Sequence, residues 1–199
     1  MPLPQIVLAS SSPYRKTQLS KLQLPFVTAR PDLDETPLPN ESVSDMVNRL
    51  TLAKAKAVAD DFPEAIIIAS DQSASFNNRP VGKPHSYDKA VKQLQAFSGN
   101  TVTFLTGLVV LTPHDHRALQ TLDKTFVTFR DLSDSDIHNY LTLEAPYDCA
   151  GSFKSEGLGV TLFESIDSKD PNALIGLPMI ALCHALRESG VPLPYLETA

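Results

Sequence analysis

The sequence predicts an α/β protein built on a mixed β-sheet. In the first half of the chain, short β-branched runs alternate with amphipathic helical patterns, as they do in βαβ units. Two longer β-prone stretches follow, 101–112 and 119–130, and the turn-like TPHDH between them predicts an antiparallel hairpin. Because the 199 residues contain no repeat, low-complexity tract or linker, we expect one domain over 1–199.

The composition limits the class of partner. A formal net charge of -6 argues against a nucleic acid polymer or an anionic membrane, although a local cluster of cations can still bind a small anion. The longest apolar runs, such as 65–69, are far shorter than the ~20 residues of a membrane span. The N-terminus lacks the pattern of a signal peptide. Cys149 and Cys183 make no disulfide framework, so we expect core thiols in a reduced compartment, and hence a cytoplasmic protein.

The first helix entrance resembles an anion site. Residues 5–9 read as a short buried strand, after which Ser12 suits the N-cap position and Pro13 the first helical position. Free backbone N–H groups and the positive end of the helix dipole point outward at such an entrance, where Arg15 and Lys16 could complete a phosphate cradle. The alternative is a simple cap on an exposed helix, and the stretch lacks the glycines of a P-loop.

An acidic loop follows. The run RPDLDETPLPNES, residues 30–42, is too rich in proline and aspartate for regular structure, and DLDET within it carries three carboxylates. A divalent metal prefers such oxygen ligands, usually shared with substrate phosphates. A solvated acidic loop explains the same residues.

The helix predicted over 43–60 supplies further candidate cations. Lys54 and Lys56 both lie on it, and helical spacing alone does not choose between them. The apolar stripe that marks the buried side of this helix consists of Val43, Val47, Leu50, Ala53 and Ala57.

A carboxylate follows the most apolar strand. The segment AIIIAS, 65–70, has the look of a central strand buried on both faces, and Asp71 comes directly after it. In α/β sheets, ligands bind at such strand ends, where an aspartate can accept a proton from water or hold a metal. A turn cap is the alternative. Lys83 lies soon after, in a tight GKP turn, where a solvated lysine is equally expected.

The last third of the chain continues the alternation. Ser133 and Asp136 form a capping-box signature at the start of a helix. The segment GSFKSEG, 151–157, reads as a loop, VTLFESI as a strand, and 177–189 as a last amphipathic helix ended by a glycine.

The ordered motifs LASSSPYR, DETP, LAKAKA, ASDQ, GKP, SGNTVTFLTG, AGSFKSEG and DPNALIGLP resemble those of the Maf-like nucleotide pyrophosphatases, across nearly the whole chain. The resemblance implies a single Maf/ITPase-like α/β unit, with an elongated mixed β-sheet flanked by helices and a cleft between two lobes. It also implies cleavage of nucleoside triphosphates between the α and β phosphates, with a divalent cation, Mg²⁺ or Mn²⁺.

The same resemblance implies a role for individual residues of this sequence. Asp71 would be the general base and Glu35 a further catalytic or metal-linked carboxylate. Asp71 as the metal ligand, with Glu35 polarising the water, is the alternative. The family pattern Leu-Ala-x-x-Lys-Ala selects Lys56 over Lys54. The groups facing the phosphates would then be Ser10, Arg15, Lys56 and Lys83.

Three positions separate the branches of the family: Tyr14, Gln72 and Glu156. An aromatic residue at the first position and the wording AGSFKSEG resemble the branch that acts on 7-methyl-GTP, where tryptophan is usual and tyrosine keeps the ring. An aromatic face attracts the cationic 7-methylguanine ring, and a carboxylate can accept from its N1–H and N2–H together. A dTTP/UTP pyrophosphatase of the same family and a non-catalytic nucleotide-binding regulator of cell division stay open as alternatives. A homodimer could cover the edges of the long hairpin.

Overall fold

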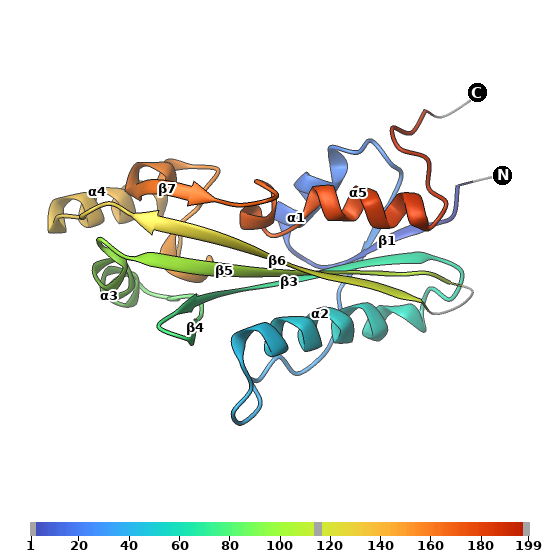
Figure 1. Ribbon diagram of the computed structural model, residues 1–199, viewed down its shortest axis with the longest axis horizontal. Helices are drawn as coiled ribbons and strands as arrows, with labels where there is room; N and C mark the ends of the chain where they lie inside the picture. The colour runs from blue at the N-terminus through green and yellow to red at the C-terminus, as the bar shows by residue number, and fades with distance from the viewer. Residues whose placement is uncertain (1–2, 114–116, 197–199) are drawn as a thin grey trace. The chain divides into compact units, whose positions relative to one another are not determined.

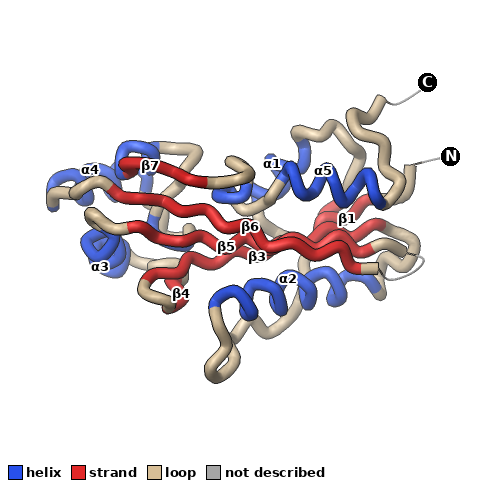
Figure 2. Tube along the Cα trace, in the orientation of Figure 1, coloured by secondary structure: helices blue, strands red, loops and turns tan. Residues whose placement is uncertain are grey.

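The computed structural model describes residues 3–113 and 117–196. The described residues form one mixed sheet with strand order β2-β1-β3-β5-β6-β7, and β4 pairs with β3. The strands are β1 (Ile6–Ala9), β2 (Val27–Ala29), β3 (Ile66–Phe76), β4 (Arg79–Val81), β5 (Thr101–Leu111), β6 (Ala118–Phe129) and β7 (Phe163–Asp167). The α-helices are α1 (Pro13–Ser20), α2 (Val43–Ala59), α3 (Tyr87–Phe97), α4 (Asp134–Glu144) and α5 (Met179–Glu188). The α/β class with a mixed sheet is confirmed (Figure 2).

The chain divides into two compact units. The first comprises Met1–Asp71, Thr106–Asp123 and Asp170–Ala199, and the second comprises Gln72–Leu105 and Lys124–Lys169. The strands β3, β5 and β6 each continue from one unit into the other. The single domain over 1–199 stays a prediction.

In the first unit, helices cover both faces of the central strands. β1 pairs in parallel with β2 and with β3, so that Val7 lies opposite Ile67. Because side chains alternate along a strand, Ile6 and Leu8 pack towards α1 and α5, whereas Val7 packs towards α2. Figure 1 shows α1 and α5 on one side of these strands and α2 on the other. The predicted burial of AIIIAS on both faces is confirmed.

β3 is longer than the sequence pattern indicated, and Asp71 lies inside it. The strand was expected to end before Asp71, but it runs on to Phe76 and pairs antiparallel with β4. Asn77 and Asn78 make the two-residue turn between them with φ of 51° and 60°, a conformation that asparagine tolerates well. The placement of Asp71 after a strand end is therefore wrong, because the hairpin partner β4 extends β3.

The second unit has an aromatic core. Phe97, Phe129 and Phe153 stand at its centre, with ring centroids 5.3 Å apart for Phe97–Phe129 and 5.7 Å apart for Phe129–Phe153. The capping box at the start of α4 is confirmed, since Ser133 Oγ accepts from the Asp136 N–H while the Asp136 carboxylate accepts from the Ser133 N–H. Arg130 adds a two-nitrogen contact to Asp136.

The β5–β6 hairpin is confirmed. Backbone hydrogen bonds join Thr112 to Arg117 and Asn100 to Phe129, so the paired positions run in opposite directions. Residues 114–116 of its expected tip lie outside the described residues. In the sheet order β3 flanks β5, and β7 pairs with β6 over Phe126–Phe129, so a homodimer at the edges of the hairpin stays a prediction.

The two cysteines are free thiols, but neither is a core residue. Cys149 and Cys183 are both half-buried, so the expectation of fully buried thiols is wrong. Partial burial still raises the pKa of the Cys183 thiol, because the charged thiolate is poorly solvated there. Among the described residues, no helix is both long and apolar enough to cross a membrane.

Candidate active site

A buried lysine joins two carboxylates in the first unit. The ammonium Nζ of Lys54 on α2 lies 2.5 Å from Asp71 Oδ1 on β3 and 3.1 Å from Glu35 Oε1 in the acidic loop. The side chains of Lys54 and Asp71 are 8% and 10% exposed, whereas that of Glu35 is 56% exposed. A buried charge needs a partner of opposite sign, so the Lys54–Asp71 pair is the fixed element of this cluster.

The alternation of β3 and the pitch of α2 explain why these side chains meet. Asp71 follows Ile67 and Ala69 at two-residue steps, and that face of β3 packs against α2. On α2, Lys54 comes one turn after the buried Leu50 and so shares its face. Asp71 therefore lies on the face of β3 that α2 covers, and Lys54 lies on the face of α2 that is turned to the sheet.

A glycine lets α2 approach the sheet closely. Gly107 on β5 lies directly beneath the helix, where a Cβ atom would collide with the Thr51 hydroxyl and lie 3.0 Å from Val47 Cγ1. Thr51 is fully buried and its hydroxyl donates to the Val47 carbonyl at 2.6 Å. This close approach sets the height of α2 above the sheet, and with it the reach of the Lys54 side chain.

Lys54 rather than Lys56 lies beside the two carboxylates, and a phosphate-facing role for Lys56 stays a prediction. Lys56 is exposed on α2, and Ala57, expected in the buried stripe, is exposed beside it. Two residues along a helix correspond to about 200° of rotation, so Lys54 and Lys56 cannot occupy the same face. Lys54 is buried on the same face of α2 as Val47 and Leu50.

Arg15 on α1 is the second cation near the carboxylates. Its Nε donates to the Gly176 carbonyl at 2.9 Å and its Nη1 donates to Ser10 Oγ at 3.4 Å. Burial lowers the pKa of Arg15, while the charges of Asp71 and Glu35 act in the opposite sense and favour the guanidinium. Arginine stays protonated in proteins, so a fixed positive charge lies within electrostatic reach of both carboxylates.

The carbonyl that holds Arg15 is itself fixed. Gly176 has φ of +114°, a left-handed conformation that favours glycine. Its carbonyl also accepts from the hydroxyl of Ser70, which is fully buried and shares its hydrogen between Gly176 and the Gly107 carbonyl. Ser70 points away from the α2 face because it alternates with Asp71 along β3.

The start of α1 has the predicted cap. Ser12 Oγ accepts from the Arg15 N–H at 3.4 Å, and Pro13 occupies the first turn. Ser10 is buried, and its hydroxyl accepts from the Ser12 N–H at 3.1 Å. Tyr14 is half-buried on the first turn of the helix. The helix entrance predicted from the sequence is confirmed, and its phosphate role stays a prediction.

The donor set of this cluster suits a hard divalent cation. Glu35 and Asp71 offer carboxylate oxygens that both reach the same Lys54 nitrogen, so the two groups are close enough to share one ion. Magnesium is usually bound by one or two carboxylates together with substrate phosphates. The described residues contain no group of three or more histidine, cysteine, aspartate or glutamate side chains arranged for a metal.

In the second unit, one glutamine ties together the loops that carry Lys83 and Glu156. Gln93 on α3 donates from Nε2 to the Gly82 carbonyl at 3.1 Å, and its Oε1 accepts from Ser152 Oγ at 2.5 Å. Lys83 is exposed in the irregular segment between β4 and α3. Both candidate residues therefore lie on loops anchored to the same helix.

Helix α4 fixes the GSFKSEG loop. The Tyr140 hydroxyl accepts from the Lys154 N–H at 3.0 Å, and the Glu144 carboxylate accepts from the Leu158 N–H at 2.8 Å. Gly159 is required by the fold of this loop, since a Cβ atom there would collide with the Lys154 carbonyl oxygen. Glu156 lies between these anchors with an exposed carboxylate. The loop is held on both sides of the residue predicted to read the base.

Comparison with known proteins places the chain in a family. The family model described as Maf-like protein matches residues 5–189. The chain belongs to the Maf-like protein family. A 7-methyl-GTP pyrophosphatase from Hydrogenovibrio crunogenus is 63% identical over 194 residues, covering 98% of this chain and 97% of the relative. The protein of the same name from Pseudomonas aeruginosa is 46% identical and covers 96% of this chain and 100% of the relative.

A solved structure shares the fold of this Maf-like chain. The Ham1 protein of Staphylococcus aureus superposes with a TM-score of 0.53 and 15% sequence identity, covering 94% of this chain and 99% of that chain. At this identity the likeness concerns the fold alone, and the expected Maf/ITPase-like fold class is confirmed. The cleft between two lobes stays a prediction.

The predicted site residues of the Maf-like chain fall into two groups. The first unit brings together Ser10, Arg15, Glu35 and Asp71, and adds Lys54 in place of Lys56. The second unit carries Gln72, Lys83 and Glu156, of which Gln72 directly follows Asp71 along β3. Convergence of Lys83 and Glu156 with the first group on one cleft stays a prediction.

Proposed function

We propose that this protein hydrolyses 7-methyl-GTP to 7-methyl-GMP and pyrophosphate in the cytoplasm. The observation that carries the proposal is the Lys54–Asp71–Glu35 cluster beside Arg15, in a chain 63% identical to a protein named for this activity. A triphosphate anion needs fixed cations, and hydrolysis needs a group that accepts a proton from water. The cluster offers both kinds of group.

The cations neutralise the triphosphate. Lys54 and Arg15 are held in place by contacts to the protein, so they are preorganised for charge that grows in the transition state. Lys83, from the second unit, is the third phosphate-facing cation of the proposal.

Asp71 orients and deprotonates the attacking water. Its carboxylate is anchored inside β3 and does not move with a loop, as a general base requires. The water attacks the α-phosphorus in line with the departing pyrophosphate. A Mg²⁺ or Mn²⁺ ion held by Asp71 and Glu35 would supply charge neutralisation on the phosphates. The protein side chains then bind the nucleotide, orient the attacking water and accept its proton.

Tyr14, Gln72 and Glu156 select the base. The ring of Tyr14 attracts the cationic 7-methylguanine by about 0.5–2 kcal/mol, and Glu156 accepts from two N–H groups of the same base. Uracil and thymine lack that pair of donors, and they would leave the Glu156 charge unpaired on binding. A homodimer stays a prediction.

A panel of triphosphates tests the substrate. We expect pyrophosphate release to be fastest with 7-methyl-GTP, and slower with GTP, dTTP and UTP, when each is supplied with Mg²⁺ or Mn²⁺ at equal concentration. Replacement of Glu156 by glutamine is expected to lower the ratio of kcat/KM for 7-methyl-GTP over UTP by about 10-fold or more, since one charged hydrogen bond is worth roughly 1.5–3 kcal/mol.

Two outcomes contradict the assignment. A preference for dTTP and UTP in the wild-type protein would identify a pyrimidine pyrophosphatase of the same family, and nucleotide binding with no pyrophosphate release would identify a sensor. Glu164→Gln, an exposed carboxylate on β7, serves as the control for loss of one negative charge in the second unit. An unchanged substrate ratio in Glu156→Gln would remove Glu156 from base recognition.

A further inference from the structure

Of the three residues Lys54, Asp71 and Glu35, Glu35 is the one held least firmly by its surroundings. It lies in the acidic loop, residues 30–42, which contains no helix or strand. Its side chain is 56% exposed, so solvent screens its 3.1 Å contact with the buried Lys54, and that contact fixes Glu35 only weakly. Something else must hold the loop if Glu35 is to keep its place beside Asp71.

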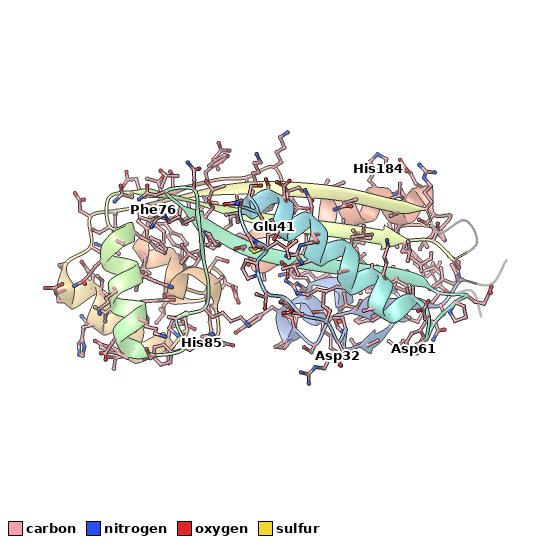
Figure 3. The ribbon with its side chains drawn as sticks, turned by 90° about the horizontal axis from the view of Figure 1, so that it is seen from below. Asp32, Glu41, Asp61, Phe76, His85 and His184 are labelled. Carbon is pink, nitrogen blue, oxygen red and sulfur yellow. The ribbon has the colours of Figure 1, made fainter. Side chains whose placement is uncertain are left out.

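A two-nitrogen ion pair lies just beyond Glu35. Arg49 on α2 donates from Nε to Glu41 Oε1 at 2.6 Å and from Nη2 to Glu41 Oε2 at 2.7 Å. Figure 3 shows Glu41 beside the first turn of α2. The Glu41 carboxylate is 8% exposed, and bidentate geometry of this kind is the strong form of the arginine–carboxylate contact.

Arg49 and Glu41 also form hydrogen bonds with the backbone of the acidic loop. Arg49 Nη2 donates to the Thr36 carbonyl at 3.3 Å, and Glu41 Oε2 accepts from the Leu38 N–H at 3.1 Å. The Thr36 N–H is in turn bonded to Asp34 Oδ1 at 2.9 Å, so the residues on either side of Glu35 are fixed. The hydrogen bonds from Arg49 lower the pKa of Glu41 to about 2, which keeps the carboxylate charged at neutral pH.

We propose that Arg49 and Glu41 form a clamp that positions Glu35 against Lys54 and Asp71. Both members of the clamp act on Glu35 through hydrogen bonds to the loop backbone, and the charge of Arg49 also lies within electrostatic reach of Asp71. They are positioning residues. The structural part of this inference is independent of substrate, and its catalytic consequence rests on the proposed function.

The clamp is tested by measuring kcat for Arg49 variants in the wild-type protein and in a Glu35→Gln background. Arg49→Gln is expected to lower kcat for pyrophosphate release by about 10- to 100-fold, the usual effect of a small misplacement of a catalytic group, with little change in KM. Arg49→Lys keeps the charge without the two-nitrogen fork and should fall between Arg49→Gln and wild type. In a Glu35→Gln background, Arg49→Gln should cause a much smaller loss. Arg49→Lys, which keeps the charge near Asp71, should cause no further loss there, because the clamp acts through Glu35.

A matched arginine provides the control. Arg130 in the second unit also binds one carboxylate with two nitrogens, that of Asp136, and donates to a threonine carbonyl, that of Thr161, at 2.8 Å. Arg130→Gln therefore removes a contact of the same kind away from the acidic loop, and its kcat should stay within about 2-fold of wild type, the size of effect typical of a surface substitution.

Hydrogen exchange tests the clamp without activity. In ligand-free Glu41→Ala, the Leu38 N–H loses its acceptor and should exchange faster, together with its neighbours in residues 34–38, while the core strands are unchanged. Unchanged exchange in this segment, or an equal kcat loss from Arg49→Gln with and without Glu35, would overturn the inference. Wild-type protein that releases no pyrophosphate would overturn the proposed function instead, and the exchange result would still decide whether the clamp fixes the loop.

Discussion

Asp71→Asn is expected to lower kcat for pyrophosphate release by about 100- to 10,000-fold, the range typical of a lost general base. Asparagine has nearly the same shape as aspartate, but its amide cannot accept the proton of the attacking water. Because Lys54, Arg15 and Lys83 remain, nucleotide affinity should survive. The measurement is kcat with 7-methyl-GTP and, separately, a binding titration with a non-hydrolysable analogue.

Asp61→Asn is the matched control for the Asp71 variant. Asp61 is an exposed aspartate just after α2, labelled in Figure 3, and its neutral form should keep the wild-type rate. A near wild-type kcat in Asp71→Asn would refute the assignment of the base. A loss of binding equal to the loss of rate would instead mean that Asp71 acts only as a metal or substrate ligand and not as the base.

Lys54→Met is the second change with a large expected effect. Methionine retains the length of the apolar stem but removes the charge, which leaves Asp71 buried without its 2.5 Å partner. We expect a drop in kcat of about 100- to 1,000-fold, as for loss of one preorganised electrostatic contact to the transition state. Thermal unfolding should also shift down, because an unpaired buried carboxylate is costly.

Lys56→Met distinguishes position from charge. Lys56 lies two residues further on the same helix, is exposed, and should tolerate the change with kcat altered by less than about 2-fold, as surface substitutions usually do. If Lys56→Met were the inactive variant and Lys54→Met active, the cluster described around Lys54 would not be the active site.

Features set by local chemistry were predicted from the sequence. The Ser12–Pro13 helix start and the Ser133–Asp136 capping box are confirmed, because both depend on residues within one turn of each other. The buried central strand is also confirmed, because its apolar side chains on both faces can be read directly from the local run of residues.

The misjudged features depend on partners far away in the chain. β3 extends past Asp71 only because β4 folds back on it, and a strand end cannot be found without its partner. Helical spacing alone does not separate Lys54 from Lys56, and the family pattern selects Lys56. The contact of Lys54 with Asp71 and Glu35 depends on how the strand and the loop fold against α2.

Some site features had no signal in the sequence. The carbonyl of Gly176 orients Arg15 across 161 residues of chain, and nothing local to either residue predicts this contact. The Arg49–Glu41 clamp is similar, since an arginine and a glutamate eight residues apart meet only when a loop folds back onto the helix. Tertiary contacts of this kind come from the fold as a whole.

The most direct test of the account is hydrolysis of 7-methyl-GTP in ¹⁸O-labelled water, followed by mass spectrometry of the products. If Asp71 directs water to the α-phosphorus, one solvent oxygen should appear in 7-methyl-GMP and none in the pyrophosphate. Label in the pyrophosphate would mean attack at the β-phosphorus, and release of labelled orthophosphate would mean attack at the γ-phosphorus. Either result would contradict the account.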